Sequence, residues 1–358
     1  MKQRSISHPI KEFYRAFPKV DLHRHLEGSL RIGTLWDVAC EYKLAVPNID
    51  KLRSLVQVNE DESYTFENFL SKFETLRMFY RSPEIISRVT QEAIEDAASD
   101  NVRYLELRFT PVALSKAQGF PLPEVMDWVI AGVEAVKQGS RITTRLIASV
   151  NRNESVSLAE QVAQLAVDRH KKGVVGLDLA GNEAQYSALP FTDVFREARK
   201  SGLRITIHAG EWGGPSNISD AISALNAERI GHGVRIMEDD RVLSMALEHG
   251  PAFEVCVTSN HQSGVVPSLS EHPLLHMLEA GLNATLNTDD PGISRIKLGD
   301  EYCTASEELG MSLKQLKERV LAAAHAAFLP EKERLALVRS LETDLNQISE
   351  LPSLKVAP

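Results

Sequence analysis

The stretch KVDLHRH, Lys19 to His25, is a short run that ends in two histidines. Seven further short runs, mostly apolar and rich in β-branched residues, follow it, and longer segments of helical period separate most of them. This alternation is typical of repeated βα units on a parallel sheet. The eight runs together predict a closed (β/α)8 barrel. The other seven are Val102 to Phe109, Ile142 to Val150, Val174 to Ala180, Arg204 to His208, Arg229 to His232, Ala252 to Thr258 and Asn283 to Asp289.

The helical segments are of two kinds. Residues 83–99 and 123–137 each carry apolar side chains at helical spacing and are predicted to be single helices between strands. Residues 30–100 hold several helices, which predicts an expanded first βα connection on the barrel face that carries chemistry. Helices predicted over residues 312–349 would close the barrel. We therefore expect one domain over residues 1–358.

Composition excludes several classes of protein. Apolar residues make up 43% of the chain and charged residues 25%, as in ordinary globular proteins. The net charge is −9 without a stripe of lysines and arginines, so we expect no nucleic-acid binding. The first twenty residues lack the apolar stretch of a signal peptide, and no long apolar run predicts a membrane span. A cytoplasmic protein is expected.

Cysteine usage narrows the choice of metal ligands. Cys40, Cys256 and Cys303 lie far apart and form no CxxC pair. Any bound metal must therefore be held by histidine and carboxylate side chains.

Polar residues gather at the C-terminal ends of the predicted strands. In a parallel barrel all eight of these ends lie on one rim, where barrel enzymes place catalytic groups. Side chains that are scattered in sequence are therefore expected to converge. They are His23, His25, Asp178, His208, Glu211, His232, Asp289 and Asp290.

Two of these histidines have the spacing of a metal-ligand pair. His23 and His25 are two apart in a strand, so their side chains project to the same face, roughly 6–7 Å apart. His208 and Asp289 would supply the third and fourth ligands. Three histidines and one aspartate suit a catalytic zinc with an open position for water, and iron, cobalt or manganese fit the same ligands.

Each residue alone also has a structural explanation. Residues 289–292 (DDPG) make a good turn or helix start, Glu211 can stabilise the following helix, and His232 between two glycines fits a packed turn. Their joint occurrence at the ends of successive strands favours a metal-dependent active site. The remaining histidines, His272 among them, lack ligand spacing and receive no role. Arg108 also ends a strand, but the sequence does not reveal its partner.

Taken together, these motifs resemble the adenosine deaminase family of the metal-dependent amidohydrolase superfamily. The resemblance extends from about Pro18 to Leu341, nearly the whole chain. The motifs that carry it are DLHRHLEG (residues 21–28), GLDLAGNE (176–183), HAGE (208–211), RIGHG (229–233), FEVC (253–256) and LNTDDP (286–291).

The resemblance implies hydrolytic deamination of adenosine and 2′-deoxyadenosine, with inosine or 2′-deoxyinosine and ammonia as products. One zinc per chain would be held by the four ligands named above, and a zinc-activated hydroxide would attack purine C6. Glu211 would give a proton to ring nitrogen N1, which demands a raised pKa in a closed pocket. His232 would orient the zinc-bound water and stabilise or deprotonate it. Asp289 would act in catalysis as well as in metal binding.

The resemblance also assigns the substrate contacts. Asp290 would bind near N7, the Gly181 backbone N–H would meet N3, and His25 and Glu27 would complete the site, with Glu27 facing the ribose. Glu27 stands where animal relatives carry aspartate, and Trp212 replaces smaller residues. The alternative substrates are therefore adenine or a modified adenine nucleoside, such as 6-aminodeoxyfutalosine or N6-methyl-AMP.

A lid over the pocket is implied as well. Phe66, Phe69, Leu70 and Phe73 resemble the apolar helical lid of the family, and the same residues also fit an ordinary core at helical spacing. A small purine nucleoside is the expected partner, and the protein is expected to be a monomer or a weak homo-oligomer.

Overall fold

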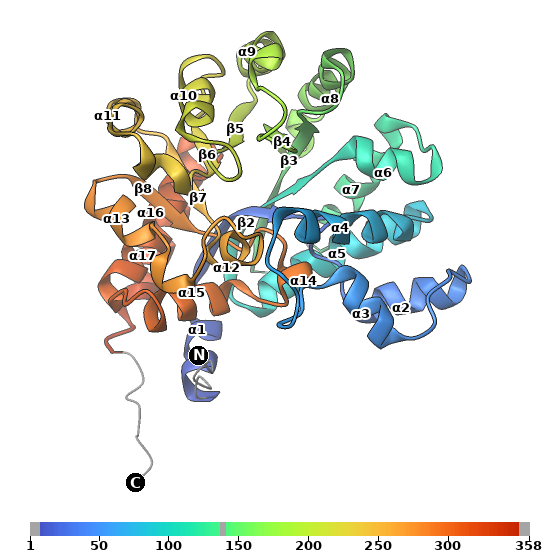
Figure 1. The fold of residues 1–358 in the computed structure, drawn as a ribbon, viewed down its shortest axis with the longest axis horizontal. Coiled ribbons are helices and arrows are strands. Elements are labelled where there is room, and N and C mark those ends of the chain that lie inside the picture. Colours follow the sequence, from blue (N-terminus) through green and yellow to red (C-terminus); the bar gives the residue numbers. More distant parts are fainter. Residues whose placement is uncertain (1–7, 137–140, 351–358) are drawn as a thin grey trace.

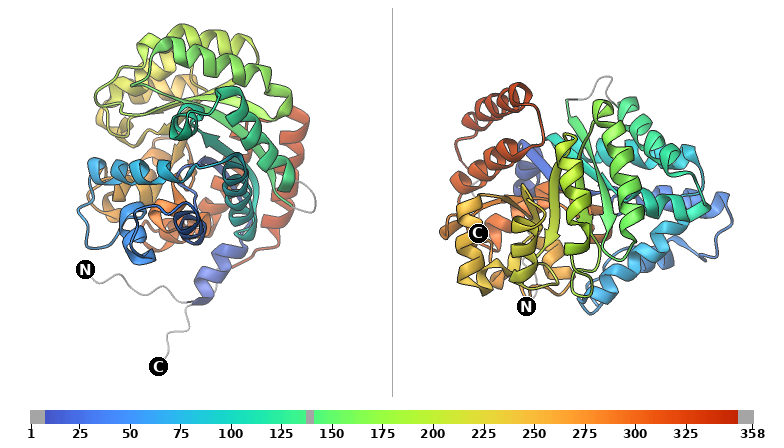
Figure 2. Two further views of the ribbon diagram at one scale, coloured as in Figure 1. Left: turned by 90° about the vertical axis from the view of Figure 1, so that its right-hand side faces the viewer. Right: turned by 90° about the horizontal axis from the view of Figure 1, so that it is seen from above.

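The computed structural model describes residues 8–136 and 141–350. Eight parallel strands form one sheet in sequence order, and helices surround it (Figures 1 and 2). Four of the predicted strands begin and end at the predicted residues. The strands are β1 Lys19–His25, β2 Val102–Phe109, β3 Thr143–Asn151, β4 Val174–Ala180, β5 Arg204–Ala209, β6 Arg229–His232, β7 Ala252–Val255 and β8 Asn283–Leu286.

Beyond the end of β8, the chain joins β1 and closes the sheet. An isolated parallel bridge links Arg24 to Asp289. The His25 N–H donates to the Asp289 carbonyl and the Asp289 N–H donates to the His23 carbonyl, each over 2.8 Å. One step earlier, the Asn287 side chain accepts from the Leu22 N–H over 2.9 Å. The predicted (β/α)8 barrel is confirmed.

The outer helices pack their apolar stripes on the barrel. Helix α5 runs over Pro83–Ser99 as predicted, because Ser82 caps it by accepting from the Ile85 N–H and proline occupies its first turn. None of the helices in residues 8–136 and 141–350 is long and apolar enough to cross a membrane. The other outer helices are α7 Leu122–Val136, α8 Val156–Asp168, α9 Thr192–Lys200, α10 Pro215–Ser223, α11 Asp240–His249, α13 Leu274–Glu279, α16 Leu313–Ala326 and α17 Glu331–Asn346.

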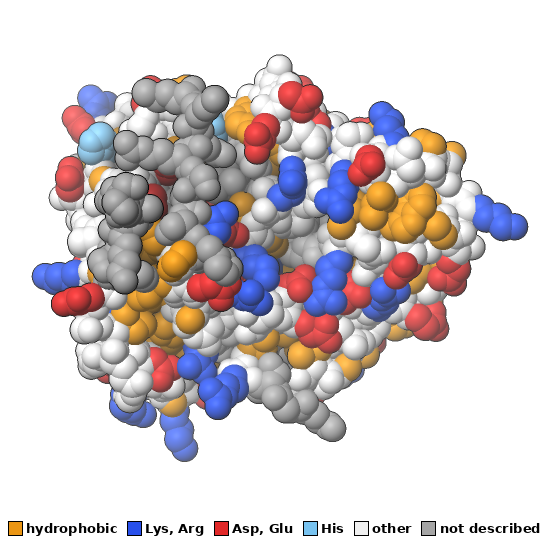
Figure 3. Space-filling model, turned by 90° about the horizontal axis from the view of Figure 1, so that it is seen from below, with side chains coloured by type: hydrophobic (Ala, Val, Ile, Leu, Met, Phe, Trp, Pro, Cys, Tyr) orange, Lys and Arg blue, Asp and Glu red, His pale blue; other side chains and the backbone are white. Residues whose placement is uncertain are grey.

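The expanded first connection contains several helices, as predicted. Three of them lie between β1 and α5 and form the blue segment on one side of the barrel (Figure 1). The three are α2 Ile32–Glu41, α3 Ile49–Val56 and α4 Phe66–Leu76. The remaining α-helices are α1 His8–Ala16, α6 Pro111–Gln118, α12 Val257–Gln262, α14 Pro291–Ser294 and α15 Leu298–Glu307. On the face seen in Figure 3, basic side chains are interspersed with acidic ones.

The last two strands are shorter than the sequence predicted. Strand β7 ends at Val255, because helix α12 starts at Val257 and the buried Glu301 carboxyl group accepts from the Thr258 N–H over 3.1 Å. Strand β8 ends at Leu286. Beyond it, Asp289 has a φ of 61°, which turns the chain out of the strand direction.

Candidate active site

A cavity of about 570 Å³ opens at the C-terminal ends of the strands. Its volume lies within the range of roughly 300–1,000 Å³ that small-molecule sites occupy. All but one of the predicted site residues line it; His23 is fully buried. The predicted residues in its wall are His25, Glu27, Gly181, His208, Glu211, His232, Asp289 and Asp290.

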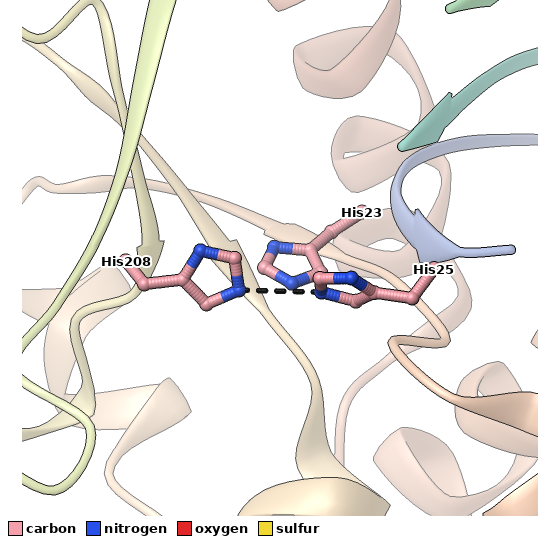
Figure 4. Close-up of side chains that lie close together, drawn as sticks. All are labelled: His23, His25 and His208. Carbon is pink, nitrogen blue, oxygen red and sulfur yellow. Dashed lines mark hydrogen bonds between the residues drawn. The ribbon is translucent and has the colours of Figure 1, made fainter. Parts of the chain in front are cut away.

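Four potential ligand atoms converge at the base of this cavity. His25 Nε2 lies 3.3 Å from His208 Nε2, as Figure 4 shows. Asp289 Oδ1 lies 3.3 Å from His23 Nε2 and 3.4 Å from His25 Nε2. His23 Nε2 is buried and has no hydrogen-bond partner among the described residues. This set fits a single metal ion that binds nitrogen and oxygen at about 2.0–2.2 Å.

Carboxylates on the far side of two histidine rings favour metal binding by the Nε2 atoms of those rings. His23 Nδ1 lies 2.8 Å from Glu254 Oε2, and His208 Nδ1 lies 3.0 Å from Asp178 Oδ1. An Nδ1–H that donates to a carboxylate leaves the Nε2 lone pair free for a metal. The buried Arg108 donates to Glu254 over 2.7 Å and lies 3.5 Å from Asp178. Arg108 thus holds both carboxylates, partners that the sequence did not reveal.

Two polar residues at the rim have a left-handed backbone. His232 and Asp289 both have a φ of 61°. This conformation costs a non-glycine residue about 1–3 kcal/mol, and residues that adopt it cluster at functional sites. Asp289 Oδ2 accepts from Ser259 Oγ over 2.6 Å. His232 Nε2 lies 3.6 Å from Glu211 Oε2 and 3.9 Å from Asp289 Oδ2. Both residues with a left-handed backbone therefore have side chains that line the cavity.

The loop after β5 carries Glu211, and Glu183 holds that loop. Glu183 accepts from the backbone N–H groups of Gly210, Glu211 and Trp212 over 2.9, 2.5 and 2.6 Å. Burial raises the pKa of Glu211 well above its ordinary value, and the nearby charges of Asp289 and Glu183 raise that pKa further. A carboxyl group in this setting is suited to act as an acid. The sequence shows Glu183 only as the last residue of the GLDLAGNE motif and does not predict its contact with this loop.

Two acidic side chains at the substrate end keep unpartnered oxygens. Glu27 Oε1 accepts from the Thr110 N–H over 2.6 Å, while Glu27 Oε2 and Asp290 Oδ1 are buried without a partner among the described residues. Burial raises the pKa of Glu27. Burial also raises the pKa of Asp290, and the charge of Asp289 adds to this effect. Both oxygens are available to a bound molecule.

Helix α4 forms one wall of the cavity. Phe69, Leu70 and Phe73 line it. Phe66 contacts Trp212 instead, with the two ring centroids 4.3 Å apart in a T-shaped arrangement. The helix therefore touches the loop that carries the candidate acid.

Known proteins are similar to this chain in sequence and in fold. The family model described as adenosine deaminase matches residues 18–344. An adenosine deaminase of Klebsiella pneumoniae is 38% identical over 328 residues, which cover 90% of this chain and 97% of that protein. The structure of the N6-methyl-AMP deaminase from Arabidopsis thaliana has a TM-score of 0.84 at 27% identity and covers 94% of this chain and 100% of that one. An adenine deaminase from Arthrobacter aurescens reaches 0.85 at 26% identity, over 92% and 100% of the two chains.

The fold and the site define the class of this protein. Eight parallel strands carry a histidine and aspartate donor set and a buried carboxyl group at one rim, which is the arrangement of a metal-dependent aminohydrolase on a (β/α)8 barrel. The chain belongs to the adenosine deaminase family.

Proposed function

We propose that this protein deaminates adenosine and 2′-deoxyadenosine to inosine or 2′-deoxyinosine and ammonia. The observation that carries the proposal is that Glu211 shares one cavity with a set of metal-ligand atoms. Because burial raises the pKa of Glu211, its carboxyl group holds the proton that the purine ring needs during the reaction. The similarity to the Klebsiella adenosine deaminase along 90% of the chain supports the same substrate.

One zinc ion per chain would be held by four ligands. Their Nε2 and carboxylate atoms match the donors that zinc prefers, and the carboxylates behind His23 and His208 orient the rings for binding. When bound, zinc acts as a Lewis acid that activates water as a nucleophile at neutral pH. The four ligands are His23, His25, His208 and Asp289.

The remaining residues manage protons and orientation. As a water oxygen bonds to C6, Glu211 transfers its proton to ring nitrogen N1, so the ring does not have to carry a negative charge. One proton of the attacking water passes to the amino group, which leaves C6 as ammonia. The other proton returns to Glu211, and the 6-oxo product remains. His232 orients the attacking oxygen, the protonated Asp290 carboxyl group donates a hydrogen bond to N7, and the Gly181 N–H donates to N3. Glu27 accepts from a hydroxyl of the ribose through its unpartnered oxygen.

A second candidate keeps this chemistry and changes the substrate to adenine or a modified adenine nucleoside. Glu27, the residue proposed to face the ribose, supports this candidate. Its Oε1 already accepts from the Thr110 N–H, so its Oε2 is the oxygen left to contact a substrate. Solved structures similar to this chain include an adenine deaminase and an N6-methyl-AMP deaminase.

A substrate panel tests the proposal. Zinc-loaded protein is mixed with adenosine, 2′-deoxyadenosine, adenine or N6-methyl-AMP, and the ultraviolet absorbance is followed. We expect the highest kcat/KM on the two nucleosides; higher values on adenine or N6-methyl-AMP would favour the second candidate. Glu211→Gln should retain stoichiometric zinc and lose turnover. Glu248→Gln, an exposed position on α11, is the control and should behave as the parent protein. An active Glu211→Gln variant would remove Glu211 from its role as the acid.

A further inference from the structure

Three buried side chains form a hydrogen-bonded chain that leads away from the cavity. His232 Nδ1 lies 3.0 Å from Asn260 Nδ2, and Asn260 Oδ1 lies 3.4 Å from His272 Nε2. The backbone N–H of Leu274 donates to His272 Nδ1 over 3.2 Å. His232, Asn260 and His272 are all buried. The chain thus connects the cavity to a backbone group at the start of α13.

The direction of every hydrogen bond follows from the Leu274 end. A backbone N–H can only donate, so His272 Nδ1 must accept and carries no proton. Burial lowers the pKa of His272 to about 3, so the ring is neutral at physiological pH and its proton sits on Nε2. That Nε2–H can only donate, and it faces Asn260 Oδ1.

The orientation of Asn260 then sets the protonation of His232. Because Asn260 Oδ1 accepts from His272, its Nδ2 group faces His232 and donates to Nδ1. His232 Nδ1 therefore has no proton, and the ring carries its proton on Nε2. Nε2 is the nitrogen that faces Glu211 and Asp289, at 3.6 and 3.9 Å.

We propose that Asn260 and His272 are positioning residues that hold His232 as a hydrogen-bond donor toward the reaction centre. A ring with a proton on Nε2 has no lone pair there, and its Nδ1 lone pair is engaged by Asn260. His232 therefore orients and stabilises the oxygen that bonds to C6, and it does not take a proton from that oxygen. The catalytic part of this inference rests on the proposed function; the protonation of the three side chains does not.

Neutron diffraction of the zinc-loaded protein in deuterated solvent tests the protonation directly. Deuterium is expected on His232 Nε2, on His272 Nε2 and on the Asn260 nitrogen that faces His232. Deuterium on His232 Nδ1 overturns the proposal. This measurement needs no substrate, so its outcome is independent of whether adenosine is deaminated.

Asn260→Asp tests the consequence for catalysis. Aspartate has nearly the same shape, but an ionised carboxylate can only accept, so it draws the His232 proton to Nδ1. Loss of a donor aimed at developing charge lowers kcat by about 10²–10³-fold, and we expect KM to change by less than about threefold. Asn346→Asp, at the exposed end of α17, is the control. An Asn260→Asp variant with parental kcat overturns the positioning role. Should that variant fail to fold, the neutron map of the parent protein decides alone.

Discussion

Replacing Glu183 with glutamine tests how the candidate acid is held in place. The Glu183 carboxylate uses Oε1 to accept from the N–H groups of Glu211 and Trp212, and Oε2 to accept from Gly210 and from Asn217 Nδ2. Glutamine keeps the length of the side chain, but its NH₂ group cannot accept a hydrogen bond. One of the two oxygens is therefore lost while the shape is kept.

The size of the effect follows from these contacts. With the glutamine oxygen at the Oε1 position, the buried N–H of Gly210 loses its acceptor, which costs about 1–3 kcal/mol. The remaining bonds lose the assistance of the negative charge, which adds about 1 kcal/mol. We expect the free energy of unfolding to fall by about 2–4 kcal/mol. Displacement of the Glu211 loop should lower kcat by about 10–100-fold, because misplacement of a reacting group by an ångström has an effect of that order.

Urea unfolding followed by circular dichroism measures the first quantity, and steady-state kinetics with saturating zinc measures the second. Glu248→Gln makes the same chemical change at an exposed position and should stay within about 0.5 kcal/mol of the parent. A Glu183→Gln protein with parental stability and parental kcat would refute the role assigned to this carboxylate.

Three further predictions address the metal, pH and the cavity wall. Chelation should abolish turnover and lower Tm, and zinc at a thousand times its Kd should restore about 4 kcal/mol of stability; an unchanged Tm in calorimetry would contradict this. Burial raises the pKa of Glu301 from 4.5 to about 8. Between pH 4.5 and about pH 8 the folded state therefore keeps a proton that the unfolded state loses, and the free energy of unfolding falls as the pH rises. Glu301→Gln should flatten that slope in urea titrations, and an identical slope would exclude the effect. Phe66→Ala removes a ring contact with Trp212 worth about 0.5–1.5 kcal/mol and should raise KM by about 2–10-fold. Phe120→Ala, which breaks the pair with Trp128 outside the cavity wall, should leave KM unchanged, and equal effects would argue against a role of α4 in binding.

Local patterns in the sequence determined much of the fold. Strands β1, β2, β4 and β6 and helix α5 begin and end where the short apolar runs and the helical spacing of apolar residues predicted. These signals are local because each depends on neighbours within a few residues. The sequence did not predict the early ends of β7 and β8, because one depends on Glu301, which is distant along the chain, and the other on the backbone turn at Asp289.

The sequence by itself also determined which residues gather at the rim, since the ends of parallel strands must meet there. Only the tertiary structure decided what those residues can do. His23 receives its orientation from Glu254, 231 positions away, and His232 from Asn260, 28 positions away on another element. The spacing of apolar residues along the sequence does not predict such pairings, because they depend on how the closed barrel places its loops. The sequence therefore identifies the residue types that permit the chemistry. Which nitrogen of each histidine carries the proton depends on side chains that are distant in sequence and close in space.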